Sequence, residues 1–369
     1  MKKLLLSTVL CLPFLTSCDA GYDTTGTDSD TDDDTTSDEL FAGPSDGFSW
    51  ALSLDDDGNS FVLTKKVTPS STANTARMTG SFRDDDEFFV LSISSALPST
   101  VTSATITGIK ISDDIIVLSS FDSALNGETL ALIENADCPS SDLSLGWQTL
   151  QSEADTESDE IGFYGNFTYT QGNTTASLGA QHPLNDATIS LNATSTSDLE
   201  CADGVAEHDD GDHYLSSSAV AIVEQLGTNY RRHIAFAHDD IDAVANLDDD
   251  YFGIMRDKEP DDNLLIKLAC SAGECTLSEV IDHEDTSTLT DRYTLSFTED
   301  DIDEPGDGFL TATLTVIDNV VTNPPSAKAS CMANVDFPTS SSATLKVLSC
   351  VAQAPDDNTK LLSFIVKTD

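Results

Sequence analysis

Apolar and polar residues alternate with a period of two over many short stretches of this chain. The clearest stretch is 48–54 (FSWALSL), in which the large side chains fall on every second position. Such alternation predicts a β-strand with one buried face. An acidic, glycine-containing segment at 55–59 and a second apolar run at 61–63 follow directly. This order predicts a β-hairpin.

Similar runs predict strands along the rest of the chain. We expect them at 77–82, 88–94, 105–111, 115–119, 129–134, 163–170, 174–180, 187–193, 219–224, 232–237, 251–256, 264–269, 292–297, 309–317, 327–335, 344–351 and 361–367. No segment keeps a helical period over three turns, although 218–226 and 241–247 are also compatible with short helices. Closely spaced strands separated by Gly, Asp, Asn and Pro are typical of sandwiches and barrels. The predicted fold class is therefore all-β, with two or three antiparallel β-sandwich or barrel-like domains.

Two parts of the chain have a similar pattern, which suggests an internal duplication. Residues 50–54, an acidic turn and residues 61–64 are matched by residues 293–297, an acidic turn and residues 309–311. In both places two more predicted strands follow. A four-strand meander used twice would produce this pattern, as would unrelated alternation on β scaffolds.

The N-terminal residues have the features of an export signal. Lys2 and Lys3 precede an apolar stretch, Leu4–Leu15, which is too short to span a bilayer. The following tetrapeptide, Leu15-Thr16-Ser17-Cys18, resembles the lipobox of bacterial lipoproteins. The resemblance implies that the Cys18 thiol receives a diacylglyceryl group and that Cys18 becomes the first mature residue. An ordinary signal peptide cleaved nearby is the alternative.

The same resemblance predicts where the protein is found. A lipidated Cys18 places it in the bacterial cell envelope, attached to a membrane through its N-terminal lipid. An outer-membrane or cell-surface position is favoured, because a long acidic segment follows the cysteine. Asp19 resembles the signal that retains lipoproteins of enteric bacteria at the periplasmic face of the inner membrane, so that position is the alternative.

Changes in composition suggest the domain limits. Residues 19–38 contain almost only Asp, Thr, Ser and Gly, which cannot form a core. Polar stretches at 151–160 and 202–214 interrupt the strand-rich remainder. The predicted order is a signal peptide (1–17), a disordered acidic tether (18–40), a β domain (41–150), a β segment that either stands alone or joins the next part (151–205) and one or more β domains (206–369).

The net charge of the chain limits the classes of partner that it can bind. Seventeen basic residues against 65 acidic ones give a net charge of −48. Such a chain repels nucleic acid and anionic headgroups and attracts cations, so we expect no nucleic-acid partner. Solubility in a salty habitat, calcium bound at acidic loops, and a cationic partner are three explanations of the charge. We therefore predict no cofactor, with calcium at the acidic loops as the alternative.

The cysteines support export. Besides Cys11 in the signal and Cys18, six remain, and an even number in an exported chain predicts disulfides. Cys270 and Cys275 flank a short loop, and Cys331 and Cys350 lie in consecutive predicted strands. Elimination leaves Cys138 with Cys201. The chain has no CxxC spacing, so zinc bound by thiolates is not favoured as an alternative.

The densest group of metal-ligand residues lies at 207–213 (EHDDGDH). Imidazoles beside carboxylates suit zinc, copper or nickel, and carboxylates alone suit calcium. The candidate ligands are His208, Asp210, Asp212, His213 and His238. A solvated loop with incidental histidines is the alternative. Asp55, Asp57 and Gly58 resemble a fragment of a calcium loop, but a β-turn explains them better.

No pattern predicts a catalytic residue. The chain has no GxSxG, HExxH, GxGxxG or Walker A motif, and each mature cysteine has a disulfide partner to hand. The expected function is therefore non-catalytic: a lipid-anchored envelope protein with a structural, adhesive or ligand-binding role toward a cation, protein or glycan. The alternatives are an exported β-fold hydrolase with calcium-supported loops and a metal-binding lipoprotein.

Overall fold

A computed structural model describes most of the chain after residue 38. The described residues are 39–369 except 46, 68–73, 86, 98–104, 120–124, 126, 135–136, 153–162, 171–174, 179–181, 184–194, 199, 203, 208–211, 227–228, 240, 257–262, 299–308, 318–322, 339–343 and 369. Cys18 and most of the predicted tether (18–40) therefore lie outside them, but Glu39 and Leu40 already belong to the first strand, so the predicted tether is two residues too long. Within this part of the chain, no helix has the length and apolar character needed to cross a membrane.

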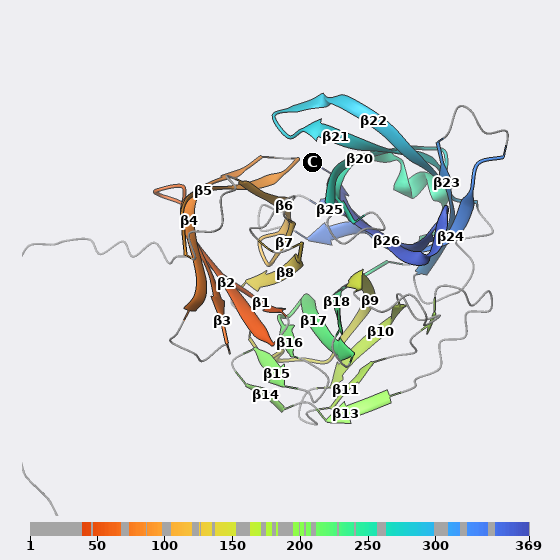
Figure 1. Cartoon of the computed structure of the whole chain (residues 1–369). Helices are drawn as coiled ribbons and strands as arrows, with labels where there is room; N and C mark the ends of the chain where they lie inside the picture. Colours follow the sequence, from red (N-terminus) through yellow and green to blue (C-terminus); the bar gives the residue numbers. More distant parts are fainter. Residues whose placement is uncertain are drawn as a thin grey trace, which may run out of the picture. The chain divides into compact units, whose positions relative to one another are not determined.

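The first described part is a closed antiparallel barrel, which we call the N-terminal barrel (Figure 1). Its strands are β1 (Glu39–Ser45), β2 (Phe48–Asp55), β3 (Ser60–Lys66), β4 (Asn74–Asp84), β5 (Phe89–Leu97), β6 (Thr105–Ser112), β7 (Ile115–Ser119) and β8 (Thr129–Glu134). Each strand pairs with the next, and β1 closes the ring by pairing with β8. Closure leaves no free strand edge around the ring.

Alternation places the large side chains of this barrel inside it. Trp50, Leu52 and Leu54 of β2 are at most 2% exposed and pack with Phe41 of β1 and Phe61 of β3. Trp50 is therefore a core residue of the barrel. Because these side chains fill the interior, the barrel is a packed core.

The middle part is an open, mixed-length sheet. Its strands are β9 (Leu143–Ser152), β10 (Phe163–Thr170), β11 (Thr175–Leu178), β12 (His182–Pro183), β13 (Ser195–Asp198), β14 (Glu200–Ala202), β15 (Val205–Glu207), β16 (His213–Leu215), β17 (Ala219–Leu226) and β18 (Asn229–Phe236). Their order is β13-β11-β10-β9-β18-β17-β16-β15-β14, with β12 beside β10. Strand β9 lies inside the sheet, where it pairs with β10 and β18.

The last part is a second closed antiparallel barrel, the C-terminal barrel (Figure 1). Its strands are β19 (Asp249–Arg256), β20 (Asn263–Ser271), β21 (Glu274–Asp282), β22 (Asp285–Ser296), β23 (Phe309–Val316), β24 (Ser326–Pro338), β25 (Thr344–Ala354) and β26 (Asp357–Thr368). A short 3₁₀ helix, η1 (Val244–Leu247), precedes it. The chain is thus all-β in its described part, as the sequence predicts, and the two closed rings are barrels.

A continuous apolar core joins the two barrels to the middle sheet. It includes Val117 of the N-terminal barrel, Leu150 and Ile234 of the middle sheet, and Ile254 and Ile365 of the C-terminal barrel. In β7 all five residues are buried, because alternate side chains face the barrel interior and this shared core. A strand buried on both faces appears in sequence as an uninterrupted apolar run.

Both barrels close at a glycine in the fifth position of their first strand. A Cβ atom on Gly43 of β1 would lie 2.1 Å from the carbonyl oxygen of Ala131 in β8. A Cβ atom on Gly253 of β19 would lie 2.0 Å from the carbonyl oxygen of Ile365 in β26. Only glycine lets the first and last strands approach this closely.

We call the contact between the first and last strands at this glycine the seam. When the two barrels are aligned at their seams, their strands correspond in order, but the two segments with the similar sequence pattern do not coincide. Phe41 and Tyr251 are both buried two positions before the seam glycine. The pattern at 50–54 belongs to the second strand of its barrel, whereas the matching pattern at 293–297 belongs to the fourth. The proposed pairing of these segments is therefore not a structural equivalence. It arose because interior positions alternate in every strand of both barrels.

Three further expectations can be compared with the strands. The 55–59 turn joins β2 and β3 as an antiparallel hairpin, as predicted. Segment 218–226 is mostly strand β17, and η1 covers the end of segment 241–247. The domain limit near residue 150 falls inside β9, which runs to Ser152 and hydrogen-bonds with β18.

The structure contains the three predicted disulfides, two of them favoured by spacing and Cys138–Cys201 left by elimination. Cys270–Cys275 and Cys331–Cys350 each join residues directly opposite each other in neighbouring strands, β20 with β21 and β24 with β25. Cys138–Cys201 ties the segment after β8 to β14, 63 residues further along the chain. The two cross-strand bridges lie in the interior of the C-terminal barrel.

Candidate functional site

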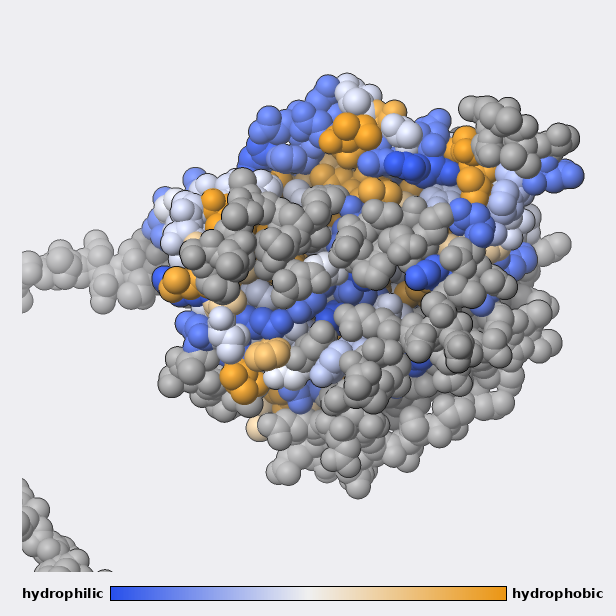
Figure 2. Space-filling view, in the orientation of Figure 1, coloured by the Kyte–Doolittle hydropathy of each residue, from blue (hydrophilic) through white to orange (hydrophobic). Residues whose placement is uncertain are grey.

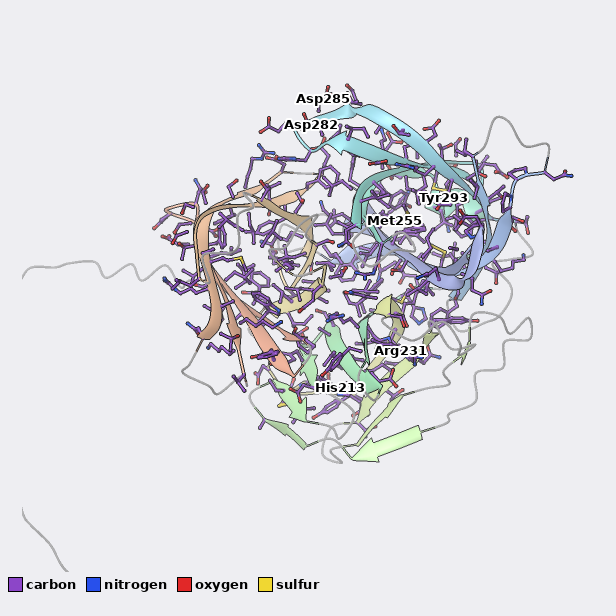
Figure 3. All side chains as sticks on the ribbon, in the orientation of Figure 1. His213, Arg231, Met255, Asp282, Asp285 and Tyr293 are labelled. Atoms are coloured by element: carbon purple, nitrogen blue, oxygen red, sulfur yellow. A yellow bond between two sulfur atoms is a disulfide. The ribbon has the colours of Figure 1, made fainter. Side chains whose placement is uncertain are left out.

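The predicted metal ligands do not form a cluster in the described residues. His208 and Asp210 lie outside them. His213 is buried in β16, where its ring stacks on Phe167 with the ring centroids 6.4 Å apart (Figure 3). Among the residues that the structure describes, no group of three His, Cys, Asp or Glu side chains is arranged to hold a metal ion.

His238 has a packing role elsewhere. Its ring lies 5.2 Å from that of Phe309, measured between centroids. It also lies so close to Gly146 that a Cβ atom there would come within 2.3 Å of the His238 ring. His238 thus packs between β9 and β23. The structure gives His213 and His238 different packing environments, and Asp212 joins neither of them in a metal-binding group.

The acidic turn at 55–59 is stabilised by hydrogen bonds to the carboxylate of Asp55. Asp55 Oδ1 accepts a hydrogen bond from the backbone N–H of Gly58 at 3.1 Å, and Asp55 Oδ2 accepts one from Ser60 Oγ at 3.3 Å. Asn59 has a φ of 46°. These features are those of a β-turn, in which Asp and Gly meet local backbone needs.

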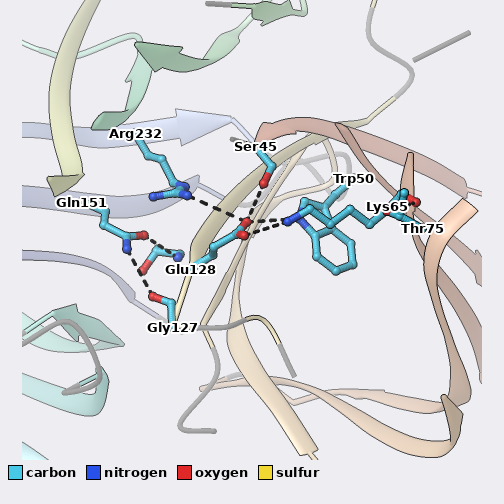
Figure 4. A network of polar contacts seen from close by, with 9 residues as sticks. Ser45, Trp50, Lys65, Thr75, Gly127, Glu128, Gln151 and Arg232 are labelled. Carbon is cyan, nitrogen blue, oxygen red and sulfur yellow. Dashed lines mark hydrogen bonds and ion pairs between the residues drawn. The ribbon is translucent and has the colours of Figure 1, made fainter. Parts of the chain in front are cut away.

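The most concentrated polar site is a buried carboxylate, Glu128, between the N-terminal barrel and the middle sheet (Figure 4). Its side chain accepts hydrogen bonds from Ser45 Oγ at 2.6 Å, Trp50 Nε1 at 3.3 Å and Lys65 Nζ at 2.8 Å. Arg232 Nη2 of β18 lies 3.9 Å from Glu128 Oε2. We call Glu128 and these four partners the Glu128 cluster.

The partners of Glu128 keep it ionised. Burial raises the pKa of Glu128, but the charges of Arg232 and Lys65, with hydrogen bonds from Lys65 and Ser45, outweigh burial and hold the pKa below its usual value. The Lys65 ammonium also lies over the rings of Phe48 and Trp50, 4.7 and 5.3 Å from their centroids. This buried ion pair links β18 to the barrel, and removal of either partner would leave an uncompensated buried charge.

The residues beside Glu128 extend the network to the C-terminal barrel. The carbonyl oxygen of Gly127 accepts hydrogen bonds from Gln151 Nε2 at 3.2 Å and from Arg256 Nη1 at 2.7 Å. Gln151 Oε1 in turn accepts from the backbone N–H of Thr129 at 2.7 Å. One short segment, 127–129, is therefore held by strands β9 and β19 together.

A second buried network in the middle sheet resembles a catalytic triad in its order of groups. His233 Nδ1 lies 3.1 Å from Thr149 Oγ1, and His233 Nε2 lies 3.4 Å from Glu224 Oε2. Because the carboxylate only accepts, Nε2 carries the proton and Nδ1 accepts from the hydroxyl. Burial lowers the pKa of His233, although Glu224 acts in the opposite direction.

This second network cannot reach a substrate. Thr149 and His233 are 1% and 3% exposed. The indole of Trp147 packs edge-on against the His233 ring, with centroids 4.8 Å apart. A nucleophile must lie about 3 Å from the reacting atom, and a hydroxyl buried as deeply as that of Thr149 gives a substrate no access in the described part of the chain. The network therefore orders three neighbouring strands, β9, β17 and β18.

A small cavity lies where the middle sheet meets both barrels. It has room for about one water molecule. Its polar lining residues are Ser119, Thr129, Arg256, Asn263 and Ser363. No carboxylate lines it, so it lacks the paired acids that glycoside hydrolysis requires.

The residues of these networks carry no signal in the sequence. Glu128 is bonded to residues that are 63 to 83 positions away in the chain, and Arg232 is more distant still. Each of them is one polar residue beside a predicted strand. Only the pairing of strands brings them together.

Comparison with known proteins yields no family. No family model matches this chain, and no curated protein matches it. The isotype 1 transferrin binding protein B from serogroup B Neisseria meningitidis aligns with 88% of this chain at 8% identity and a TM-score of 0.26. This chain spans just under two thirds (66%) of that protein's length.

A second solved structure also aligns over most of the chain. The beta chain of DNA polymerase III from Streptococcus pneumoniae TIGR4 aligns with 90% of this chain and 91% of its own length, at 10% identity and a TM-score of 0.13. At these TM-scores, neither likeness supports an assignment of fold or function.

Proposed function

We propose that this protein is a lipid-anchored protein of the bacterial cell envelope, whose β body binds a partner on its outer surface without catalysis. The anchor would be Cys18, which follows the apolar stretch Leu4–Leu15 in a lipobox-like context. Two or more acyl chains give stable attachment where a single chain does not. The acidic residues 19–38 would hold the body away from anionic headgroups.

The packed interiors of the barrels are the observation that supports surface binding. Phe41, Trp50 and Phe61 fill the N-terminal barrel, while Tyr251, Tyr293 and Phe364 help to fill the C-terminal one. Small-molecule sites typically need a cleft of about 300–1,000 Å³. Rigid barrels with filled interiors are better suited to presenting their loops and edges to a macromolecule.

Metabolic labelling tests the anchor. Cells expressing the full chain are fed an alkyne analogue of palmitate, and the protein is isolated and examined for incorporated label. Labelling that is lost in the Cys18→Ser variant supports the proposal, with Cys11→Ser as the matched control that keeps its label. An unlabelled wild-type protein would refute lipid anchoring.

Protease treatment of intact cells then locates the body. Digestion of the protein on intact cells supports a surface position. Protection until the outer membrane is permeabilised supports a periplasmic one. Replacing Asp19 by Ser tests the retention signal, because a change of membrane fraction is expected only if Asp19 is recognised.

A further inference from the structure

Strands β21 and β22 extend beyond the wall of the C-terminal barrel as a two-stranded ribbon. Strand β20 accompanies β21 only as far as Glu279, and β23 accompanies β22 only from Tyr293 onward. Between these limits the two strands pair with each other, for example Val280 with Leu289. Figure 3 shows Asp282 and Asp285 at the end of this hairpin.

The ribbon is held in place at both of its ends. Val280 is 4% exposed and belongs to the apolar core shared by the barrels and the middle sheet. At the tip, Nη1 of Arg83 in β4 lies 3.9 Å from Oε1 of Glu284. The Asp285 carboxylate accepts hydrogen bonds from the backbone N–H and hydroxyl of Ser287. The ribbon is therefore a preformed element.

The outer edge of β22, from Thr286 to Asp291, is not paired with any strand of the described part of the chain. We call it the β22 edge. Most of its residues are exposed, including Leu289 at 39%. Figure 2, in the same view, shows hydrophobic residues among hydrophilic ones on this upper surface.

The direction of the backbone groups can be deduced from the ladder between β20 and β21. Cys270 and Cys275 lie opposite each other with their Cα atoms 4.0 Å apart, the spacing of a pair without mutual backbone hydrogen bonds. The register is regular from Cys275 to Glu279, so by alternation Glu279 also turns its N–H and C=O away from β20 and toward β22. Glu279 lies opposite Thr290, so the N–H and C=O of Leu289, one position earlier, point away from β21. These groups are available to another strand.

The residues of the β22 edge favour pairing more than they prevent it. Natural proteins usually protect a free edge with charges, proline or a bulge. Residues 286–290 (TSTLT) contain neither charge nor proline, and threonine is well suited to strands. The register with β21 shifts between Asp285 and Leu289, so the pairing is regular only from Leu289 to Asp291. Acidic residues flank this neutral centre, Asp285 on one side and Asp291 on the other.

A second copy of the chain is a poor partner for this edge. Antiparallel pairing of two β22 edges about Thr288 would place Asp285 of each copy opposite Asp291 of the other. Like charges directly opposite each other destabilise a strand pair. The net charge of −48 adds repulsion between copies.

We propose that the β22 edge binds an extended segment of a partner protein by strand addition, and that this segment has a neutral, β-branched centre and basic ends. Main-chain hydrogen bonds would supply affinity, while Asp285 and Asp291 would select basic flanks. The proposal names a partner class for the surface binding proposed above and rests on that part of it only.

A designed peptide tests the proposal with the purified full chain. The probe has alternating valine and threonine in its centre and two lysines at each end. Its charge-reversed counterpart carries glutamates in place of the lysines. We expect saturable binding of the lysine peptide only, and hydrogen–deuterium exchange protection concentrated at Thr286–Asp291. Absence of saturable binding, or protection located elsewhere, would overturn the proposal.

Two variants at one position separate backbone from side-chain contributions. Leu289→Pro removes an N–H that faces the free side, which an edge strand tolerates. It should weaken peptide binding by roughly tenfold or more, whereas Leu289→Ser keeps the N–H and should weaken it less. Leu97→Ser, at another exposed leucine (64%), should bind like the wild type.

Either of two results with these variants would refute strand addition. One is wild-type affinity in Leu289→Pro, and the other is equal weakening by Leu97→Ser and Leu289→Ser. Peptide binding by the purified chain does not depend on lipidation. A protein that lacks the palmitate label but binds at the β22 edge would therefore refute the anchor alone.

Discussion

Arg256 donates a hydrogen bond from Nη1 to the carbonyl oxygen of Gly127 at 2.7 Å, which joins the first strand of the C-terminal barrel to the segment before the last strand of the N-terminal barrel. Arg256 is only 8% exposed. Its removal leaves Gly127 with the weaker, neutral bond from Gln151. The contact therefore couples the stabilities of both barrels.

We expect Arg256→Leu to lower the free energy of unfolding by about 2 kcal/mol, because hydrogen bonds to charged groups contribute about 1.5–3 kcal/mol. Denaturation by urea, followed by tryptophan fluorescence, measures the change. Arg77→Leu replaces an exposed arginine and should change it by less than about 0.5 kcal/mol. Similar values for the two variants would contradict the importance of the contact.

The seam glycines should be intolerant of even one added methyl group. Gly43→Ala and Gly253→Ala would each place a Cβ atom against a backbone carbonyl, so the seam strands must separate. We expect losses of about 3 kcal/mol or more, at the upper end for overpacking. Thermal unfolding and hydrogen exchange of β8 and β26 measure this effect.

Gly47 is the control for these two variants. It lies in a turn at a φ of 63°, and no atom lies within 4 Å of the position that a Cβ atom would occupy there. Gly47→Asn should cost less than about 1 kcal/mol, since asparagine accepts this conformation. If Gly43→Ala and Gly253→Ala were as mild as Gly47→Asn, close approach would not explain the seam.

The Glu128 cluster predicts a specific acid sensitivity. The folded-state pKa of Glu128 is held below the ordinary value of 4.5. Its contribution to stability is therefore fully present above pH 4.5 and is lost as the pH falls through the lower, folded-state pKa. Wild type should be more stable than Glu128→Gln near neutral pH, and the difference should narrow below pH 4.5. Urea denaturation between pH 7 and pH 3 tests this, and a constant difference would contradict it.

The three disulfides should contribute unequally to stability. Their sequence separations are 63 residues for Cys138–Cys201, 19 for Cys331–Cys350 and 5 for Cys270–Cys275. The loop-entropy relation gives about 4, 3 and 2 kcal/mol in the same order. Paired Cys→Ala variants, compared by chemical denaturation, test the ranking. A larger loss from the shortest loop than from the longest would show that chain entropy does not decide it.

The sequence predicts most strands of this protein but not their neighbours. Alternation reveals β2 because one face is polar, and an apolar run reveals β7 because both faces are buried. Strand β9 escapes notice since it combines Gly146 with buried polar residues such as Gln148 and Gln151, which disturb the pattern. Those polar side chains can be buried because they form hydrogen bonds with the barrels, Gln148 with the carbonyl oxygen of Ser330 and Gln151 with that of Gly127.

The candidate sites, too, could be predicted from the sequence only in part. Two disulfides follow from spacing, because Cys270 with Cys275 and Cys331 with Cys350 lie in adjacent strands, and elimination then leaves Cys138 with Cys201. His213 and His238 look alike in sequence but pack against different aromatic rings, Phe167 and Phe309. The β22 edge is invisible in sequence, since a free edge depends on where β20 and β23 stop.

The closure of the N-terminal barrel also has a mechanical consequence. Glu39 begins β1, so any tension on the preceding residues enters the fold through this strand. On one side β1 has a ladder with β2 along its whole length, and on the other it meets β8 near Phe41 and Ala42. A pull strong enough to peel β1 away would open the ring at Gly43. The strand that follows the proposed tether is thus the one whose loss would unfasten the barrel.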